Sequence, residues 1–386
     1  MDDVIVIGAG PVGNYLALKL AELGHQITVL EQQTEIAQTV CCTGILGKDC
    51  LEAFPLPNEL ILRPASSASL YSPSGRTLRI EKETPQAYVI DRQAFQRWLA
   101  EQAQQKGVRY FTSCPVRDIH VDEHGVKVEL STSSLESRTV VIASGFGSGL
   151  VRRLGLGDLT DFAIGAQAEV ASQINEVELY VGRQVAPGFF AWLVPTNPGR
   201  ALAGLFCRRQ ANLYLRNLMD SLYQQGKITS PEATPSYKRV PLGPLPRTYR
   251  PRLLVVGEAA GQVKPTTGGG IYYGLICAEI AAGVLHQALS SGDFSAGQFS
   301  RYQKEWKQRL GREIQIGRFA RQLFERLGDR QIDHIIGLVQ ADGLHQALLS
   351  SPDFSFDWHG EFILRTLKYK ALHSVLRIGR IPFSRG

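Results

Sequence analysis

The sequence lacks the cysteine patterns that mark zinc sites and disulfide frameworks. Its six cysteines show no paired C-x-x-C spacing, and no secretory leader precedes them. We therefore expect no metal site, and a reducing compartment in which the thiols stay free. Long apolar runs are also absent, because the longest, Ile271 to Leu285, is too short to span a bilayer and contains Glu279. Since Met1 and two aspartates lead directly into strand-like residues, we expect a cytoplasmic protein.

A large excess of charge of either sign is missing as well. The chain has 42 lysines and arginines against 36 aspartates and glutamates. This balance suits an anionic cofactor, a phosphorylated substrate or a membrane face, but it is too weak to indicate nucleic acid as a partner. At 386 residues the chain exceeds the usual limit of roughly 250–300 for a single core. We expect two domains, or one large domain with an inserted module.

The amino terminus carries a complete dinucleotide-binding pattern. Residues 4–7 read as a parallel strand buried on both faces, and GAGPVG (residues 8–13) leads into a helix. A second strand, residues 26–30, ends at Glu31. Gly8, Gly10 and Gly13 permit the tight turn, the approach of a pyrophosphate and close helix–strand packing, and Glu31 can accept hydrogen bonds from ribose hydroxyls. This pattern predicts dinucleotide binding without distinguishing NAD from FAD.

A second glycine cluster lies far downstream. Residues 255–274, VVGEAAGQVKPTTGGGIYYG, begin as a buried strand and place Gly268, Gly269 and Gly270 just before an apolar helix that starts at Ile271. Glycine is conformationally free in the unfolded chain, so three in succession are costly to order. The cluster therefore indicates that a bound group lies against this backbone.

The order of these segments resembles the flavoprotein superfamily typified by aromatic hydroxylases. Between the glycine clusters lie YVIDR (residues 88–92), ahead of a helix, and a buried strand that ends in residues 140–145. In that superfamily a single FAD is held by the N-terminal unit and by a downstream Gly-Asp strand, which here carries Glu258 instead of aspartate. The resemblance implies that Arg92, Glu258 and the three glycines contact FAD, with the pyrimidine edge of the flavin at the start of the helix.

Within that superfamily, residues 257–274 are similar to the flavin segment of geranylgeranyl reductases, and the similarity covers most of the chain to about residue 290. Those enzymes use FAD to saturate isolated double bonds of isoprenoids. The resemblance implies a prenyl lipid substrate. It also implies an electron donor, NADPH or reduced ferredoxin, that binds only transiently, because no second GxGxxG unit of comparable quality appears.

Two shorter segments extend the resemblance. FAWLVP (residues 190–195), followed by GLF (residues 204–206), is similar to the family's YxWxFP…GxG substrate motif, although positions 190, 194 and 206 depart from it. The resemblance implies that Phe190, Trp192 and Tyr273 line the substrate pocket, while core packing of two aromatic strands is an equally good explanation. Cys42 occupies the place of a Cys-x-Gly element and is the candidate catalytic residue. An inert buried cysteine is the alternative.

We expect an α/β protein with a discontinuous Rossmann-type FAD-binding domain made of residues 1–60, 85–160 and 248–290. A β-rich substrate domain, residues 161–247, is inserted, and residues 291–386 form a helical C-terminal region. The last helix of that region places apolar side chains on one face with basic side chains around it, which suits either peripheral membrane contact or packing against the body. Its apolar residues are Leu364, Leu367, Ala371, Leu372, Val375 and Leu376.

Two other functions remain open on the sequence alone. A FAD-dependent monooxygenase that hydroxylates an apolar or aromatic substrate uses the same framework, and oxygen incorporation into a product would identify it. A flavin-binding redox sensor would bind prenyl lipid without turning it over. No histidine or carboxylate stands out as a proton donor for the reductase reaction.

Overall fold

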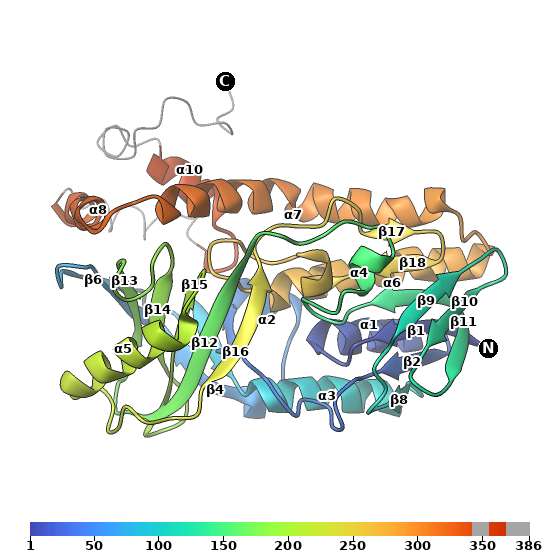
Figure 1. Cartoon of the computed structure of the whole chain (residues 1–386), viewed down its shortest axis with the longest axis horizontal. Helices are drawn as coiled ribbons and strands as arrows, with labels where there is room; N and C mark the ends of the chain where they lie inside the picture. The colour runs from blue at the N-terminus through green and yellow to red at the C-terminus, as the bar shows by residue number, and fades with distance from the viewer. Residues whose placement is uncertain (342–354, 368–386) are drawn as a thin grey trace. The chain divides into compact units, whose positions relative to one another are not determined.

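The computed structural model of this chain describes residues 1–341 and 355–367 (Figure 1). The described chain forms two compact units, and each is interrupted in sequence by the other. The first unit consists of Met1–Val40, Arg92–Phe162 and Val240–Arg312, and the second of Cys41–Asp91, Ala163–Arg239 and the chain from Glu313 onward.

The first unit contains an α/β core with short accessory elements. These are β1 (Asp2–Ile7), α1 (Pro11–Glu22), β2 (Ile27–Leu30), α3 (Arg92–Gln105), β8 (Arg109–Phe111), β9 (Asp118–Val121), β10 (Val126–Glu129), β11 (Ser134–Ile142), α4 (Leu150–Arg153), β17 (Tyr249–Arg250), β18 (Leu253–Val255), the 3-10 turn η2 (Gly257–Ala260), α6 (Ile271–Ser291) and the start of α7 (Ala296–Glu325).

The sheet of the first unit has the strand order β17-β18-β11-β1-β2-β8, and the five strands from β18 to β8 are parallel. Ile5 of β1 pairs with Val140 of β11 on one side and with Thr28 of β2 on the other. β9 and β10 form an antiparallel extension of β11. Because the chain leaves β1 toward β2 on one side and β11 lies on the other, the order reverses at β1, where open parallel sheets bind their ligands.

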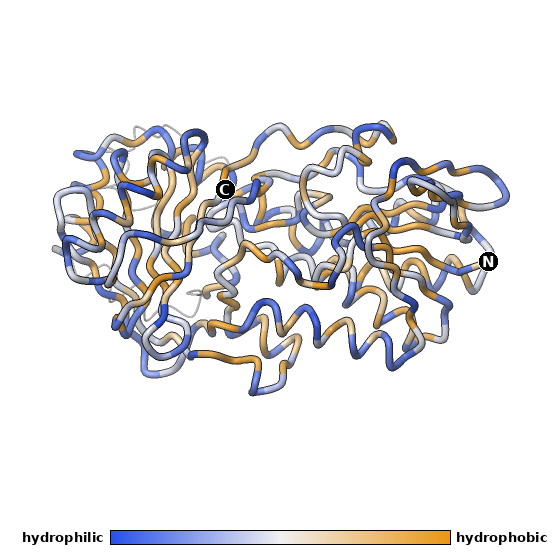
Figure 2. The backbone as a smooth tube through the Cα atoms, turned by 60° about the horizontal axis from the view of Figure 1, so that its bottom comes forward, coloured by the Kyte–Doolittle hydropathy of each residue, from blue (hydrophilic) through white to orange (hydrophobic). Residues whose placement is uncertain are grey.

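Helix α1 packs against α3 and α6, beside the parallel strands (Figure 1). The strands are hydrophobic and the turns between them hydrophilic (Figure 2). Val4, Ile5 and Val6 have no exposed surface, which is the pattern expected of a central parallel strand. Helix α6 is long and apolar enough to cross a membrane by length and composition, but 61% of that stretch is buried inside the protein. This burial is typical of a core helix.

The second unit is rich in strands. Its elements are β3 (Ile45–Gly47), α2 (Lys48–Ala53), the 3-10 turn η1 (Asn58–Leu60), β4 (Ile61–Ala65), β5 (Ser67–Tyr71), β6 (Thr77–Glu81), β7 (Ala87–Ile90), β12 (Phe162–Ala171), β13 (Val177–Val181), β14 (Phe190–Pro195), β15 (Arg200–Cys207), α5 (Ala211–Gln224), β16 (Ser236–Pro241), the end of α7, α8 (Asp329–Ala341) and α10 (Gly360–Leu367).

Seven of these strands form one sheet in the order β16-β12-β15-β14-β13-β5-β6. Helix α5 covers one face, where alternate residues of the strands, such as Ala203 and Leu205 of β15, pack against Leu215 and Leu218 (Figure 1). The side chains that alternate with these point to the opposite face of the sheet. That face packs against the small antiparallel sheet β3-β7-β4 and against α7 and α8. The two faces therefore have separate hydrophobic cores.

The fold class agrees with the sequence prediction, but the boundaries differ from those expected. Residues 41–60 and 85–91 belong to the second unit, and residues 291–312 belong to the first. Residues 61–84 were not assigned to a domain from the sequence pattern, and they supply β5 and β6 to the large sheet. Most of the basic C-terminal helix proposed from the sequence lies outside the described residues, which include Leu364 and Leu367 of α10, both buried.

Candidate functional site

The N-terminal glycine turn has a distinct geometric demand at each of its three glycines. Gly8 has φ +108°, and a Cβ there would lie 2.6 Å from the carbonyl oxygen of Ala143. A Cβ at Gly13 would lie 2.0 Å from the carbonyl oxygen of Gly8, so glycine is required for the helix to approach the strand. Around Gly10, by contrast, no protein atom lies within 4 Å of an added Cβ. The turn is therefore crowded by protein at its ends and open at its centre.

This open centre faces the start of α1. Gly10 is the N-cap residue, it makes no side-chain capping hydrogen bond, and Pro11 occupies the first helical turn. The first N–H groups of a helix have no partner inside the helix, and together with the helix dipole they favour an anion. A pyrophosphate placed at Gly10 would meet these groups without steric conflict.

The carboxylate of Glu31 is tied to the same turn. Its Oε2 accepts a hydrogen bond from the backbone N–H of Ala9 at 2.8 Å, and its Oε1 accepts one from Gln33 N at 2.9 Å. Each carboxylate oxygen has a further lone pair for a ribose hydroxyl. The two hydrogen bonds fix the acid at the carboxyl end of β2, beside the glycine turn.

Three polar side chains that sequence reasoning missed brace this turn from behind. The side-chain amide of Asn14 donates to the carbonyl oxygens of Ala9 and Gln96, both at 3.0 Å, and Gln96 donates to Ala9 O at 2.7 Å. The hydroxyl of Tyr110 donates to Asn14 Oδ1 at 3.1 Å, and burial raises its pKa. Asn14 is fully buried within an otherwise amphipathic helix, and the helical periodicity alone gives no signal that separates it from a surface asparagine.

The distant glycine segment packs directly on the N-terminal turn. A Cβ at Gly257 would lie 3.2 Å from the methyl carbons of Val12, and a Cβ at Gly274 would lie 2.4 Å from Val12 Cγ2. Val12 lies inside the GxGxxG motif, between Gly10 and Gly13. The structure therefore brings together the two segments that the sequence predicts to hold one FAD.

The three consecutive glycines form the loop that precedes α6. Gly268 has φ +70°, and Gly270 is the N-cap of α6 without a side-chain capping hydrogen bond. The loop is closed by backbone hydrogen bonds of Lys264, whose N–H donates to Gly269 O at 2.9 Å and whose carbonyl accepts from Gly268 N at 2.8 Å. Gly270 has no side chain with which to cap α6, and the positive end of the helix dipole at this point favours the negative charge that the flavin prediction places there.

Glu258 lies beside this helix start. A Cβ at Gly270 would be 3.4 Å from Glu258 Oε1, and one at Gly145, after β11, would be 4.0 Å from Glu258 Oε2. The acid therefore lies between the ends of two parallel strands and the N-terminus of α6. The missing side chain of Gly270 leaves room for this acid, which is longer than aspartate, whereas a Cβ at Gly145 would make only an ordinary contact.

Arg92 begins α3 in the first unit. Its Nη2 is 3.5 Å from Gln96 Oε1, while the buried Nε and Nη1 atoms have no hydrogen-bond partner. A buried guanidinium edge without an acceptor is costly, and an anionic or hydroxyl-rich cofactor is the kind of group that satisfies it.

The residues of the first unit fit FAD on three observations. These are the open space at Gly10, the orphaned edge of Arg92, and glycine as the N-cap residue of both α1 and α6. Gly8, Gly10, Gly13 and Glu31 suit the adenosine diphosphate part, and Glu258 with Gly268, Gly269 and Gly270 suits the flavin part. No group of three metal-ligating side chains occurs among the described residues.

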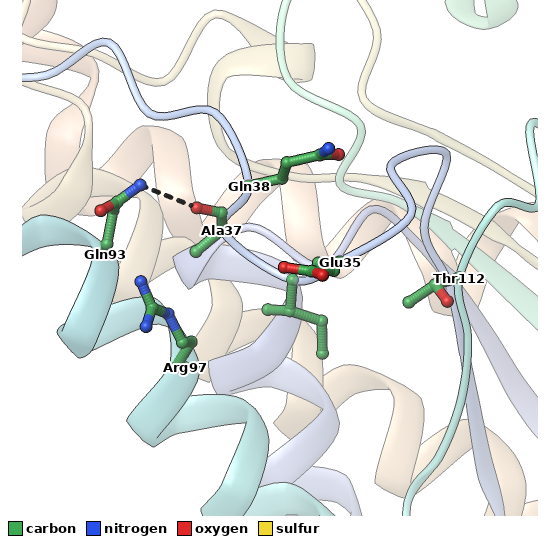
Figure 3. A pocket seen from close by; sticks show the side chains of 7 residues that line it. Glu35, Ala37, Gln38, Gln93, Arg97 and Thr112 are labelled. Atoms are coloured by element: carbon green, nitrogen blue, oxygen red, sulfur yellow. Dashed lines mark hydrogen bonds between the residues drawn. The ribbon is translucent and has the colours of Figure 1, made fainter.

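A surface pocket of about 520 Å³ lies at the carboxyl ends of β2 and β8 (Figure 3). Gln93 and Arg97 extend from α3 toward the loop that carries Ala37, and Gln93 Nε2 donates to Ala37 O at 3.1 Å. Ala37 has φ +63°, an uncommon conformation for a residue with a side chain. The volume falls within the range of small-molecule pockets.

In the second unit, the sheet face opposite α5 carries an aromatic cluster of Phe190, Trp192 and Phe206. The ring centroids of Trp192 and Phe206 are 5.1 Å apart, and that of Phe190 lies 5.8 and 5.9 Å from these two rings. Glycines make room for them: a Cβ at Gly204 would lie 2.5 Å from Trp192 Cζ2, and one at Gly165 would lie 3.0 Å from Phe206. We call this surface the aromatic face.

Cys42 lies shortly before β3, and β3 contributes to the core of the aromatic face. Ile45 of β3 and Val89 of β7 pack in the same cluster as Trp192. Cys42 is half-buried as a free thiol, and its Sγ accepts a hydrogen bond from Gly44 N at 3.5 Å. Cys42 therefore lies on the loop that leads into β3, and β3 packs in the same core as the aromatic face.

Tyr273, which is predicted to line the substrate pocket, lies in a different unit from Phe190 and Trp192. It lies in the first turn of α6 in the first unit and is only 1% exposed. Phe190 and Trp192 belong to the second unit, and Trp192 is 7% exposed with its Nε1 lacking a hydrogen-bond partner. Both Tyr273 and Trp192 are buried, and their contact with substrate stays a prediction.

Comparison with known families and curated proteins gives consistent matches. A family model described as FAD dependent oxidoreductase matches residues 46–210. The chain is 30% identical over 353 residues to digeranylgeranylglycerophospholipid reductase 2 of Methanopyrus kandleri, covering 86% of this chain and 88% of that protein. It is 29% identical over 362 residues to digeranylgeranylglycerophospholipid reductase 2 of Methanothermobacter thermautotrophicus, covering 89% and 92%.

Solved structures share the fold. A geranylgeranyl bacteriochlorophyll reductase-like protein from Thermoplasma acidophilum has a TM-score of 0.83 at 23% identity, covering 97% of this chain and 98% of that one. The halogenase PltM, solved with FAD, has a TM-score of 0.69 at 15% identity, covering 97% and 90%. These identities establish the architecture alone. Taken with the curated relatives, they show that the chain belongs to the digeranylgeranylglycerophospholipid reductase family of FAD-dependent oxidoreductases.

Proposed function

We propose that the protein reduces isolated carbon–carbon double bonds in the geranylgeranyl or related polyprenyl chain of a lipid. The observation that carries this proposal is the aromatic face, where glycines at 165 and 204 let Phe206 and Trp192 approach the sheet backbone closely. An isoprenoid chain has no polar group to hydrogen-bond, so apolar and aromatic surface is what holds it. The names of the curated relatives support the same substrate class.

The reduced flavin would supply the hydride, and a proton completes the saturation of the double bond. The chain's own contribution is to hold and orient. The glycine turn with Glu31 holds the adenosine diphosphate, and the positive end of the α6 dipole favours negative charge on the pyrimidine edge. Cys42, on the loop before β3, positions or gates the alkene. Phe190 and Trp192 exclude water from the apolar chain.

The electron donor is a further part of the proposal, and NADPH or reduced ferredoxin would bind transiently. A cytoplasmic location, with membrane contact through the C-terminal residues, is likewise proposed from the sequence. The electron donor is tested by supplying each donor separately to the purified protein. Membrane contact is tested by sedimentation with anionic vesicles.

The central experiment is anaerobic. The bound flavin is reduced chemically, geranylgeranyl compounds are added one at a time, and flavin reoxidation is followed together with product mass. We expect reoxidation and a product heavier by two hydrogens. A purified protein that retains reduced flavin with every prenyl compound would contradict the proposal. Oxygen incorporation into product under air would instead assign a monooxygenase.

A further inference from the structure

In the second unit, a segment near the end of the described chain contacts the first turn of α2, the short helix that follows Cys42 and β3. Asp357 Oδ2 accepts a hydrogen bond from the backbone N–H of Cys50 at 3.0 Å. The N-cap residue of α2 is Gly47, which has no side chain, so Asp357 supplies the acceptor that an N-cap side chain ordinarily provides. A carboxylate 307 residues further along the chain therefore caps this helix.

Asp357 occupies the space where a side chain at residue 47 would lie. A Cβ at Gly47 would be 2.0 Å from Asp357 Oδ2 and 2.4 Å from Asp357 Cγ, although the backbone of Gly47 is in an ordinary extended conformation. Glycine is required here by the approach of the carboxylate and not by a turn. Asp357 is only 1% exposed, and a carboxylate this deeply buried is costly unless its hydrogen bonds are satisfied. Residues 47 and 357 are therefore matched in size.

Further hydrogen bonds hold Asp357 in this place. Ser355 Oγ donates to the carboxylate of Asp49, also in the first turn of α2, at 2.8 Å, and it accepts from the backbone N–H of Asp357 at 3.0 Å. On the other side of Asp357, Glu313 Oε1 accepts from the backbone N–H of Gly360 at 2.8 Å. The segment that carries Asp357 is therefore fixed both to α2 and to α7.

The start of α2 is continuous with the loop of residues 41–44, which we call the Cys42 loop. Gly47 is the last residue of β3, a strand of three residues, and lies five positions after Cys42. Gly44 joins the two, because its N–H donates to Cys42 Sγ at 3.5 Å and its carbonyl oxygen accepts from Ile90 N at 2.9 Å. A displacement of the end of so short a strand would be carried to the thiol.

We propose that Asp357 is a positioning residue that fixes the junction of β3 and α2 and thereby holds the Cys42 thiol in its working place. This inference rests on the proposed function, in which Cys42 positions or gates the alkene, and it adds a residue that acts through the Cys42 loop. A carboxylate that only stabilised α2 would affect unfolding and leave the thiol as it is. The two roles therefore predict different results for Cys42.

The first test needs no lipid. Alkylation of the oxidised holoprotein by iodoacetamide is followed by tandem mass spectrometry, which separates Cys42 from Cys41, with the half-buried Cys114 of the first unit as internal reference. Asp357→Ala should raise the alkylation rate of Cys42 about 10-fold or more, the effect of losing a hydrogen bond to a charged group, and leave that of Cys114 unchanged. Asp357→Asn, which keeps a carbonyl acceptor, should restore most of the wild-type rate.

Asp333→Ala is the matched control. It removes a carboxylate of the same unit that accepts from the hydroxyl groups of Ser72 and Ser74 at 2.6 and 2.7 Å, at the turn between β5 and β6. We expect it to lower the thermal stability without changing the alkylation of Cys42. Equal alkylation of Cys42 in the wild type and Asp357→Ala, or the same rise in Asp333→Ala, would overturn the proposal.

A double-mutant cycle links Asp357 to the reaction. In the anaerobic reoxidation assay, Asp357→Ala should lower the maximal rate about 10- to 100-fold and leave KM and flavin content unchanged. In the Cys42→Ala protein the same substitution should cause no further loss of rate, because both changes act through one thiol. Losses of rate that simply multiply would refute the coupling. If no prenyl lipid reoxidises the wild-type flavin, the reductase function fails, and alkylation alone decides whether Asp357 holds the Cys42 loop.

Discussion

Val12 and Gly274 are in contact, although the first lies in the N-terminal glycine motif and the second in α6, because only the missing side chain of Gly274 leaves room for Val12 Cγ2. This contact joins the two segments that bracket the proposed cofactor site. It explains why the helix after the triple glycine carries one more glycine four residues past its N-cap. The cofactor site is therefore built by packing between distant segments as well as by local turns.

Substitution of two glycines of the same motif should have different effects, one on flavin retention and the other on stability. Gly10→Ala places a methyl group in open space on an extended backbone, so we expect unchanged thermal stability but weakened retention of FAD. Gly13→Ala forces a carbon against Gly8 O and should lower the free energy of unfolding by about 1–3 kcal/mol. Thermal unfolding and the visible absorbance of purified protein measure both. Gly10→Ala protein that keeps full flavin would argue against pyrophosphate at this position.

The aromatic face can be tested through the glycine that makes room for it. Gly204→Ala places a Cβ 2.5 Å from Trp192 Cζ2 and 2.7 Å from Ala166 O, so the indole must move. We expect a loss of about 1–3 kcal/mol in stability and a higher KM for prenyl lipid. Gly283→Ala in α6 is the control, because nothing lies within 4 Å there and alanine should stabilise the helix by up to about 1 kcal/mol.

Cys42→Ala separates a role in substrate positioning from packing. We expect the variant to keep its flavin and to be reoxidised by prenyl lipid more slowly, by up to about 100-fold if the alkene is misplaced by 1 Å. Stopped-flow reoxidation measures this rate. Cys114→Ala, a half-buried cysteine of the first unit, should leave it unchanged. Equal rates for the wild type and Cys42→Ala would reduce Cys42 to a structural residue.

His25 should make stability depend on pH. Its Nε2 lies 2.9 Å from His286 Nδ1, and burial lowers its pKa below the ordinary 6.5, an effect opposed by Asp3 and reinforced by His286 and Arg138. The unfolded chain therefore binds this proton more readily, so stability is complete above about pH 6.5 and falls as pH drops through the window below it. His25→Gln should flatten this decline in chemical denaturation measured from pH 7 to pH 5.

Asp3 acts at lower pH, which keeps the two effects apart. Burial alone would raise its pKa, but hydrogen bonds from Gln26 N and Arg138 hold the value below 3.8. Its contribution to stability is present above that value and is lost as pH falls below it. A decline between pH 7 and pH 5 that is identical in wild type and His25→Gln would exclude His25 as its source.

Local patterns predicted much of the fold. The strand at residues 4–7, which lies within β1, and the helix start at Ile271 were predicted at the positions where they occur, because short apolar runs and glycine placement are local signals. The pairing of β5 with β13 was not predictable, since parallel pairing of distant strands leaves no mark in either strand. The partition of the chain was missed at residues 41–60 for the same reason.

In the candidate site, too, features set by local sequence were predictable and features set by long-range contacts were not. The motif glycines and Glu31 are visible because each meets a steric or hydrogen-bonding demand of a known turn. The bracing of that turn by Asn14 and Gln96 depends on which polar side chains become neighbours after folding. A single sequence records the residue types but not their partners.

The interleaving of the two units has a consequence for biosynthesis. Because the first unit needs residues as late as Arg312, and the second needs residues beyond it, neither core can close while the ribosome is still translating the middle of the message. Apolar strands such as β1 and β11 must wait, exposed, for partners that are synthesised much later. We therefore expect the nascent polypeptide to depend on chaperones and to acquire its prosthetic group only near the end of synthesis.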